Sequence, residues 1–298
     1  MITKYASFLK EKAPSWFYKL AAQAWTDYTF PRHLFIELNS SCNLRCSYCP
    51  REKTANNMDM DTFREVVDEA SHFGSRSFSL HLFGEPFLSP NLFESIEYIK
   101  FKNRKHTILL TTNGTLLERN RNLDRLLASR VDQVFWSWRP EAKFSEETKE
   151  RLRRWGKFKV RFIEELVSDS EREAWKNWPN KEGRALHNYG GEIDLTQFQS
   201  NETFTQAKSG DSSRWPCYHL WLAPAVAWNG NFLLCCADPH QREVLGNVKE
   251  TTISVLWHSS RLTKVRESHL KGQFEGICEK CDVWKQYPDM FFKLQKRS

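Results

Sequence analysis

Three cysteines, Cys42, Cys46 and Cys49, lie in a short polar stretch that follows an apolar run. Thiolates are ligands for iron–sulfur clusters and for zinc. A four-iron cluster takes four ligands, so a loop that supplies three thiolates leaves one iron open to another molecule. The alternatives are a zinc knuckle or buried thiols, but a polar loop is a poor place to bury three cysteines. The spacing therefore favours a cluster with an open coordination position.

The other five cysteines form a second group near the C-terminal end: Cys217, Cys235, Cys236, Cys278 and Cys281. Cys278-Glu-Lys-Cys281 is a CxxC pair, which by itself suits zinc as well as iron–sulfur clusters. Asn229-Gly230 separates two apolar runs, so we expect a β-hairpin that brings the segment of Cys217 close to Cys235. A structural zinc site with four cysteines is the alternative to a cluster here.

The elements that must position these residues alternate between strand-like and helix-like patterns. The predicted strands cover residues 33–38, 76–83, 107–112, 131–138 and 157–164, and the predicted helices cover 61–73, 91–102, 119–129 and 146–155. Repeated strand–helix units predict an α/β fold with a parallel sheet that closes or half-closes into a barrel. Functional residues of such a barrel lie on the loops after the strands, where Cys42, Cys46 and Cys49 also fall.

The chain divides into three predicted parts. Residues 1–30 form a helical extension, with two short helices over 3–27 that we expect to pack on the main domain in preference to a membrane surface. Residues 31–205 form the barrel, and residues 206–298 form a small module of a hairpin and a helix over 253–268. Ser, Thr, Gln, Asn and Gly dominate residues 197–214, which is typical of a linker.

The composition is that of a folded protein with a large core: 298 residues, of which 40% are hydrophobic and 27% charged. Forty-four Lys and Arg against 37 Asp and Glu leave a net charge of +7, spread along the chain and not gathered into a nucleic-acid-binding arm. The longest apolar run, Leu220 to Trp228, is too short to span a membrane. No secretory signal is apparent, so we expect a cytoplasmic protein whose cysteines stay reduced and ligate metal.

Three motifs, each after its own predicted strand, resemble those of the radical S-adenosylmethionine (AdoMet) superfamily: CNLRCSYC (42–49), FGEP (83–86) and TTNGTLL (111–117). The resemblance implies a partial (β/α)6 TIM-like barrel, with Cys42, Cys46 and Cys49 holding a 4Fe–4S cluster that binds AdoMet. It further implies that Gly84 and Glu85 hold the amino group of AdoMet, that Tyr48 lies against its adenine, and that Asn113 and Ser137 approach its ribose or carboxylate. The chain departs from the family at Phe83, where a glycine is frequent, and at Trp138-Arg139-Pro140, where Asp-Gly is common.

The second cysteine group resembles the truncated SPASM module called Twitch, which holds one auxiliary 4Fe–4S cluster. The resemblance implies that Cys217, Cys235, Cys278 and Cys281 supply its four ligands, with Cys236 as a spare thiol. A cluster whose irons are all ligated by protein cannot bind substrate directly, so its implied use is electron transfer.

One AdoMet cluster and one Twitch cluster on a short chain are most similar to the 2-deoxy-scyllo-inosamine dehydrogenase family. The resemblance implies that a 5′-deoxyadenosyl radical abstracts hydrogen from a small polar substrate, a sugar or cyclitol, which is then oxidised by two electrons. A flavodoxin- or ferredoxin-type protein is the expected electron donor. His187 is the candidate proton acceptor, and Cys236 is a second candidate catalytic residue.

Three alternatives stay open. A SPASM-type enzyme that matures a peptide is one, and an epimerase in which Cys236 gives a hydrogen atom to the substrate is another. A zinc-dependent nucleic-acid-binding module is the alternative from a different class, but it leaves the placement of FGEP and TTNGTLL after successive strands unexplained.

Overall fold

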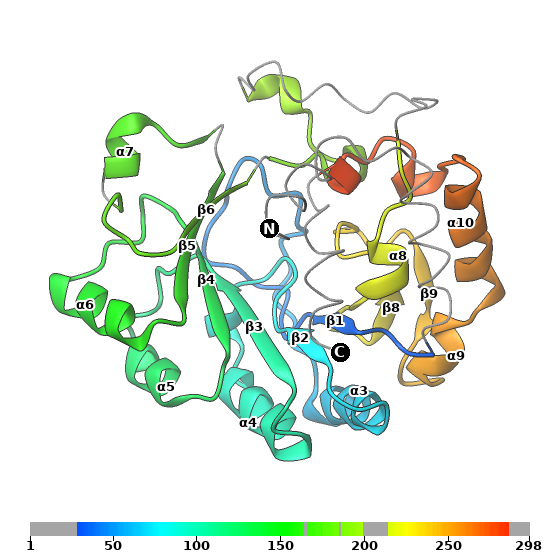
Figure 1. Ribbon diagram of the computed structural model, residues 1–298, viewed down its shortest axis with the longest axis horizontal. Coiled ribbons are helices and arrows are strands. Elements are labelled where there is room, and N and C mark those ends of the chain that lie inside the picture. The colour runs from blue at the N-terminus through cyan, green and yellow to red at the C-terminus, as the bar shows by residue number, and fades with distance from the viewer. Residues whose placement is uncertain (1–28, 164–165, 174, 185, 199–213, 286–298) are drawn as a thin grey trace, which may run out of the picture.

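The computed structural model describes residues 29–163, 166–173, 175–184, 186–198 and 214–285. Within these residues, the strands form a single sheet in the order β6-β5-β4-β3-β2-β1-β7-β8-β9 (Figure 1). The first six are parallel to their neighbours: β1 (His33–Ile36), β2 (Ser77–Ser79), β3 (Thr107–Thr112), β4 (Gln133–Ser137), β5 (Phe158–Ile163) and β6 (Lys181–Arg184). The predicted α/β fold with a partial barrel is confirmed.

Helices connect the parallel strands and lie along one side of them (Figure 1). They are α3 (Met60–His72), α4 (Leu92–Lys102), α5 (Asn122–Ala128), α6 (Glu146–Trp155) and α7 (Asp169–Glu173). Side-chain caps mark two of the starts, since Asp59 accepts a hydrogen bond from the backbone N–H of Thr62 at α3 and Ser145 accepts one from Thr148 at α6. The α6 helix has the bounds expected from the sequence.

The burial of successive side chains alternates along the strands, which gives the sheet a core face and a concave face. In β3, Ile108 and Leu110 are fully buried and belong to the main core with Phe63 of α3 and Ile96 of α4. Their neighbour Thr111 is only partly buried. Because successive side chains of a strand point to opposite faces, the partly buried positions line the inside of the partial barrel.

The C-terminal part extends the same sheet. A short helix, α8 (His219–Leu222), precedes β7 (Ala225–Val226), β8 (Asn231–Leu233) and β9 (Val244–Asn247), and α9 (Ile253–Trp257) and α10 (Ser260–Leu270) follow. The predicted hairpin is present as the antiparallel pair β7–β8, and its turn holds Gly230 at φ 86°. Strand β7 pairs in parallel with β1, through Phe35 with Ala225 and Ile36 with Val226. The partial barrel and the hairpin therefore share one backbone hydrogen-bond network.

Only Ala225 and Val226 of the apolar run from Leu220 to Trp228 form a strand, because Leu220 to Leu222 lie in α8. One expectation in this part was wrong. The single helix expected over 253–268 is two helices, because the Ser259 side chain accepts the N–H of Leu262 and starts α10 anew. The predicted helices over 3–27 and the predicted domain boundary at 205/206 lie outside the described residues.

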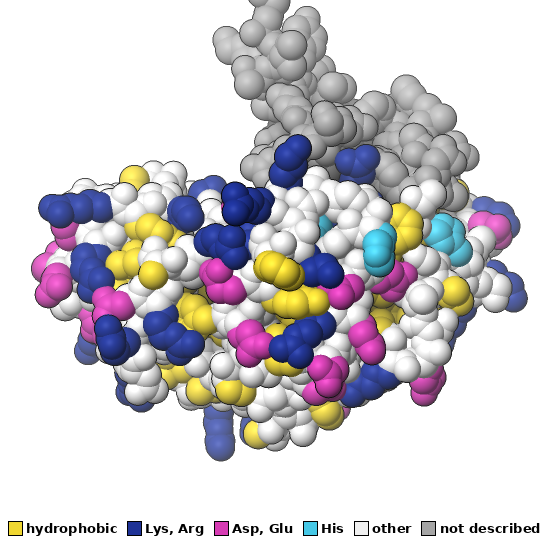
Figure 2. Space-filling view, turned by 90° about the horizontal axis from the view of Figure 1, so that it is seen from below, with side chains coloured by type: hydrophobic (Ala, Val, Ile, Leu, Met, Phe, Trp, Pro, Cys, Tyr) yellow, Lys and Arg dark blue, Asp and Glu magenta, His cyan; other side chains and the backbone are white. Residues whose placement is uncertain are grey.

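The outer surface carries acidic and basic side chains in mixed order, as Figure 2 shows for the face seen from below. Several of them form ion pairs between neighbouring helices, including Arg64 with Glu94 and Lys102 with Asp68. Among the residues that the structure describes, no helix combines the length and the apolar character needed to cross a membrane.

Candidate functional site

The first cysteine group lies in the loop between β1 and α3. Cys42, Cys46 and Cys49 are all partly buried, and the backbone N–H of Cys49 donates to the carbonyl of Cys46 (3.1 Å), which closes the turn between them. The Arg51 guanidinium donates to the carbonyl of Cys42 (3.1 Å) and ties the end of the loop to its beginning. Burial raises the pKa of the Cys42 and Cys49 thiols above the ordinary value. A bound cluster would offset this, because it binds the thiolate form.

The motif after β2 packs directly on this loop. A Cβ atom at Gly84 would lie 2.0 Å from the backbone oxygen of Asn39, so any side chain there would displace the backbone. The backbone N–H of Glu85 donates to the carbonyl of Ser41 (2.7 Å). Glycine at position 84 therefore permits the contact between the FGEP segment and the cysteine loop.

Glu85 is buried and accepts three hydrogen bonds. The donors are the hydroxyl of Thr112 (2.7 Å), the backbone N–H of Asn113 (2.8 Å) and that of Phe87 (3.3 Å). Burial raises the pKa of Glu85 to about 7 although these donors favour the charged form. A positive or hydrogen-donating ligand at this carboxylate would remove much of the cost of burying its charge.

Asn113, which directly follows β3, connects the segment after β3 to the cysteine loop. Its amide group donates to the side-chain oxygen of Asn43 (3.1 Å) and points at the sulfur of Cys42 at 3.8 Å. Three loops that are distant in sequence thus meet at the C-terminal edge of β1, β2 and β3, as the motif order predicts. Ser137 lies one strand further along, at the end of β4 and in register with Arg161 of β5.

Tyr48 belongs to the cysteine loop and contacts the loop after β4. The guanidinium carbon of Arg139 is 5.0 Å from the centre of its ring, within the range of a cation–π contact. Burial raises the pKa of Tyr48 above its usual range, and the charge of Arg139 acts in the opposite direction. Arg139 belongs to the segment in which the sequence departs from the family, and its contact with Tyr48 was not anticipated.

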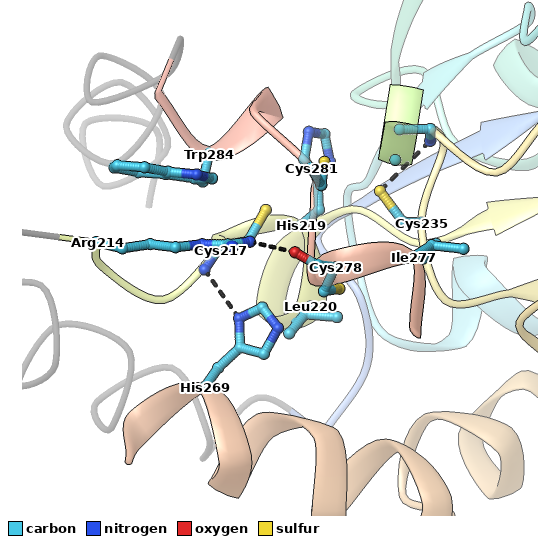
Figure 3. A pocket seen from close by; sticks show the side chains of 12 residues that line it. Arg214, Cys217, His219, Leu220, Cys235, His269, Ile277, Cys278, Cys281 and Trp284 are labelled. Carbon is cyan, nitrogen blue, oxygen red and sulfur yellow. Dashed lines mark hydrogen bonds between the residues drawn. The ribbon is translucent and has the colours of Figure 1, made fainter. Parts of the chain in front are cut away.

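Four cysteines of the second group form a candidate metal centre. Cys217, Cys235, Cys278 and Cys281 line one cavity together with His219, His269, Arg214 and Trp284 (Figure 3). Burial raises the pKa of Cys217 and Cys278 well above the ordinary value, and repulsion from the other cysteines adds to this effect. Four mutually repelling thiols around one cavity are the donor set that a 4Fe–4S cluster requires, so the residues fit this group.

The CxxC turn is held by side chains from distant segments. Arg214 donates to the carbonyls of Cys278 (2.5 Å) and Glu279 (3.0 Å). The Asn188 amide donates to the carbonyl of Lys280 (2.6 Å), and its backbone N–H donates to the Asp282 carboxylate (3.0 Å). These bonds were not anticipated from the sequence.

The two candidate catalytic residues lie near this centre. His187 is mostly buried, and its Nδ1 atom is 3.4 Å from a carboxylate oxygen of Asp282, which directly follows Cys281. Cys236 packs against the buried cluster of Ala225, Ala227 and Leu233, and its sulfur is 3.7 Å from Nδ1 of His219. Ligand atoms of His219, Cys235 and Cys236 lie within 4.8 Å of one another. His219 itself carries no motif and was missed.

Comparison with known proteins gives two family matches. Residues 36–138 match the Radical SAM superfamily, and residues 217–282 match the SPASM iron–sulfur cluster-binding domain. These ranges contain both cysteine groups described above.

Two curated relatives are similar over most of their length. The chain is 26% identical over 259 residues to the S-adenosyl-L-methionine-dependent 2-deoxy-scyllo-inosamine dehydrogenase of Niallia circulans, which covers 83% of this chain and 91% of that protein. It is 24% identical over 303 residues to the tungsten-containing aldehyde ferredoxin oxidoreductase cofactor-modifying protein of Pyrococcus furiosus. This match covers 79% of this chain and 83% of that protein.

Solved structures share the fold. The crystal structure of BtrN in complex with AdoMet and 2-DOIA matches with a TM-score of 0.61 at 20% identity, over 85% of this chain and 93% of that one. The crystal structure of Streptococcus suis SuiB bound to precursor peptide SuiA matches with a TM-score of 0.64 at 15% identity, over 90% of this chain and 73% of that one.

Proposed function

Because this chain belongs to the radical SAM superfamily and carries a SPASM domain, with AdoMet and 4Fe–4S clusters as the implied cofactors, we propose that it is a dehydrogenase-type oxidoreductase. Its substrate is a small polar molecule, a sugar or cyclitol, that loses two hydrogen atoms, which amount to two electrons and two protons. The observation that carries the proposal is similarity to 2-deoxy-scyllo-inosamine dehydrogenase over 91% of that protein.

We assign the residues around the first cysteine group to AdoMet binding. Cys42, Cys46 and Cys49 would hold the cluster, Glu85 would accept hydrogen bonds from the amino group of AdoMet, and Tyr48 would lie against the adenine. Glu85 is already oriented by Thr112 and the backbone of Asn113, so binding requires little rearrangement of the carboxylate. When bound, the AdoMet cluster supplies the 5′-deoxyadenosyl radical and the auxiliary cluster supplies an electron acceptor.

We assign the removal of the substrate proton to His187, whose Nδ1 atom lies 3.4 Å from a carboxylate oxygen of Asp282. Cys217, Cys235, Cys278 and Cys281 would be the four protein ligands of the auxiliary cluster, and they would leave it no open position for the substrate.

A peptide maturase is the second candidate within the same enzyme class. The SuiB structure includes a precursor peptide, but at 15% identity the likeness concerns the fold alone. A radical epimerase would use Cys236, whose sulfur lies 3.7 Å from Nδ1 of His219, as the hydrogen donor. An epimerase predicts a product of unchanged mass, whereas a peptide maturase that oxidises or crosslinks side chains also removes hydrogen and is distinguished by its peptide substrate.

The thiol ligands require a reducing compartment, which supports a cytoplasmic protein. A flavodoxin- or ferredoxin-type protein would supply the electron for AdoMet cleavage.

The test begins with anaerobic purification and measurement of iron, sulfide, zinc and AdoMet cleavage with dithionite. We expect about eight irons per chain, two four-iron clusters, and formation of 5′-deoxyadenosine. Sugars and cyclitols deuterated at the carbinol carbons are then screened for deuterium transfer to 5′-deoxyadenosine and for a ketone product. Transfer with a ketone supports the dehydrogenase, whereas transfer only from peptides, or a product of unchanged mass, would reject it.

A further inference from the structure

His269 lies in the last turn of α10 and lines the cavity of the auxiliary cysteines (Figure 3). Only 1% of its surface is exposed. In sequence it lies outside both cysteine motifs.

The hydrogen bonds of His269 define which ring nitrogen carries the proton. The backbone N–H of Cys217 donates to Nδ1 at 3.3 Å, so Nδ1 holds a lone pair. An imidazole ring keeps at least one N–H group, so a ring whose Nδ1 accepts a hydrogen bond carries its proton on Nε2.

This Nε2–H group is buried and has no hydrogen-bond partner in the described part of the chain. Buried donors without partners are rare in folded proteins because losing the bond to water is costly. The ring is also held in place by Phe274, which it contacts edge to face with 4.7 Å between the ring centres. The guanidinium carbon of Arg214 lies 3.8 Å from the centre of the same Phe274 ring. The donor is thus fixed in the wall of a cavity that four cysteines share.

We propose that His269 donates a hydrogen bond from Nε2 to a sulfur of the auxiliary cluster, and so raises its reduction potential. An N–H group near the cluster stabilises the reduced form, which carries one more negative charge, more than the oxidised form. His269 would therefore be a positioning residue that makes the auxiliary cluster a better electron acceptor. The inference rests on the auxiliary cluster and does not depend on which substrate is oxidised.

Two substitutions of His269 distinguish the acceptor at Nδ1 from the donor at Nε2. In His269→Asn, the side-chain oxygen can still accept from Cys217, but the chain is too short to place a donor at the position of Nε2. In His269→Gln, the amide can reach that position and restore the donor. His258→Asn is the matched control, because His258 is an exposed histidine between α9 and α10.

The variants are made in a Cys46→Ala background, so that the auxiliary cluster is the only source of signal. Iron content, the midpoint potential from an EPR-monitored titration and the coupling to exchangeable deuterons in D2O are measured. We expect His269→Asn to keep about four irons, to have a lower midpoint potential and to lose one deuteron coupling. His269→Gln should recover the coupling and part of the potential, and His258→Asn should match its parent.

An unchanged potential and an unchanged deuteron coupling in His269→Asn would overturn the inference. If both His269 variants lose iron, the parent protein labelled with ¹⁵N-histidine decides, since a ¹⁵N coupling at the reduced cluster is expected and its absence refutes the bond. Zinc in place of iron at the four cysteines also refutes it, while the natural protein, which keeps Cys46, would still cleave AdoMet with its first cluster. A failed substrate screen, in contrast, would affect only the proposed function.

Discussion

Glu85 provides the sharpest test of the AdoMet site. The unliganded protein buries this carboxyl group, and burial raises its pKa to about 7. The amino group of AdoMet would interact better with the carboxylate than with the carboxylic acid. Below pH 7 the proton on Glu85 must therefore leave before AdoMet binds well. We expect the affinity to fall roughly tenfold for each unit of pH below the pKa and to level off above it.

The assay is isothermal titration of the anaerobic protein with AdoMet at pH 6, 7 and 8, for the natural protein and for Glu85→Gln. Between pH 6 and pH 8 the natural protein should gain roughly tenfold in affinity. Glu85→Gln keeps the size of the side chain but removes the charge. It should bind more weakly by about 2 kcal/mol at pH 8, or roughly thirtyfold, and should lose this part of the pH dependence. Titration of AdoMet itself is common to both proteins, so the difference between their profiles isolates Glu85.

The raised pKa of Glu85 also predicts how the stability of the protein without AdoMet depends on pH. Stability should fall as the pH rises, whereas the affinity for AdoMet should increase. The pKa of Glu85 is higher in the folded protein than the ordinary value of 4.5, so the folded state holds the proton more tightly than the unfolded state. The free energy of unfolding without AdoMet should therefore fall as the pH rises from about 4.5 through 7, by up to about 3 kcal/mol. Glu85→Gln should remove this decrease.

Glu37 supplies the matched control. It is also buried, burial raises its pKa to about 7, and it accepts hydrogen bonds from the backbone of Phe83 and Trp228. Glu37→Gln should alter the pH dependence of stability but leave that of AdoMet binding. Equal AdoMet binding by Glu85→Gln and the natural protein, or the same loss in Glu37→Gln, would refute the role given to Glu85.

Four further substitutions test other parts of the site. Gly84→Ala should weaken AdoMet binding at least tenfold with iron retained, because its Cβ would meet the carbonyl of Asn39; normal binding by calorimetry would contradict the close approach. Cys46→Ala should abolish formation of 5′-deoxyadenosine and halve the iron content, and continued cleavage would reject the ligand assignment. Cys281→Ala should also halve the iron but still cleave AdoMet, whereas loss of both clusters would point to a different division of ligands. Cys236→Ala should keep all the iron in a metal analysis, and a large loss would make Cys236 a ligand.

Much of the barrel follows from local sequence. Strand β3 and helix α6 have the bounds that periodicity predicts, because β-branched and apolar alternation and the Ser145 cap act over a few residues. The meeting of Cys42, Glu85 and Asn113 also follows, since each comes after a parallel strand and such strands end at one edge.

Other features depend on contacts between distant segments. Nothing near Phe35 indicates that its strand pairs with Ala225, because this pairing depends on the whole sheet. Likewise, His269 lies in an ordinary helical sequence, and only the folded chain brings it to the cysteine cavity. The assignments of Tyr48, Ser137, His187 and Cys236 stay predictions.

The pairing of β1 with β7 has a consequence for biosynthesis. Phe35 leaves the ribosome early, but Ala225, its partner in the neighbouring strand, follows 190 residues later. At typical elongation rates of about 5 to 20 residues per second, one side of β1 waits on the order of 10 to 40 seconds for its partner. During this interval β1 is an open sheet edge next to the first cysteine loop, exposed to pairing with other nascent chains. Its protection depends on the arrival of the segment that also carries the second set of cysteines.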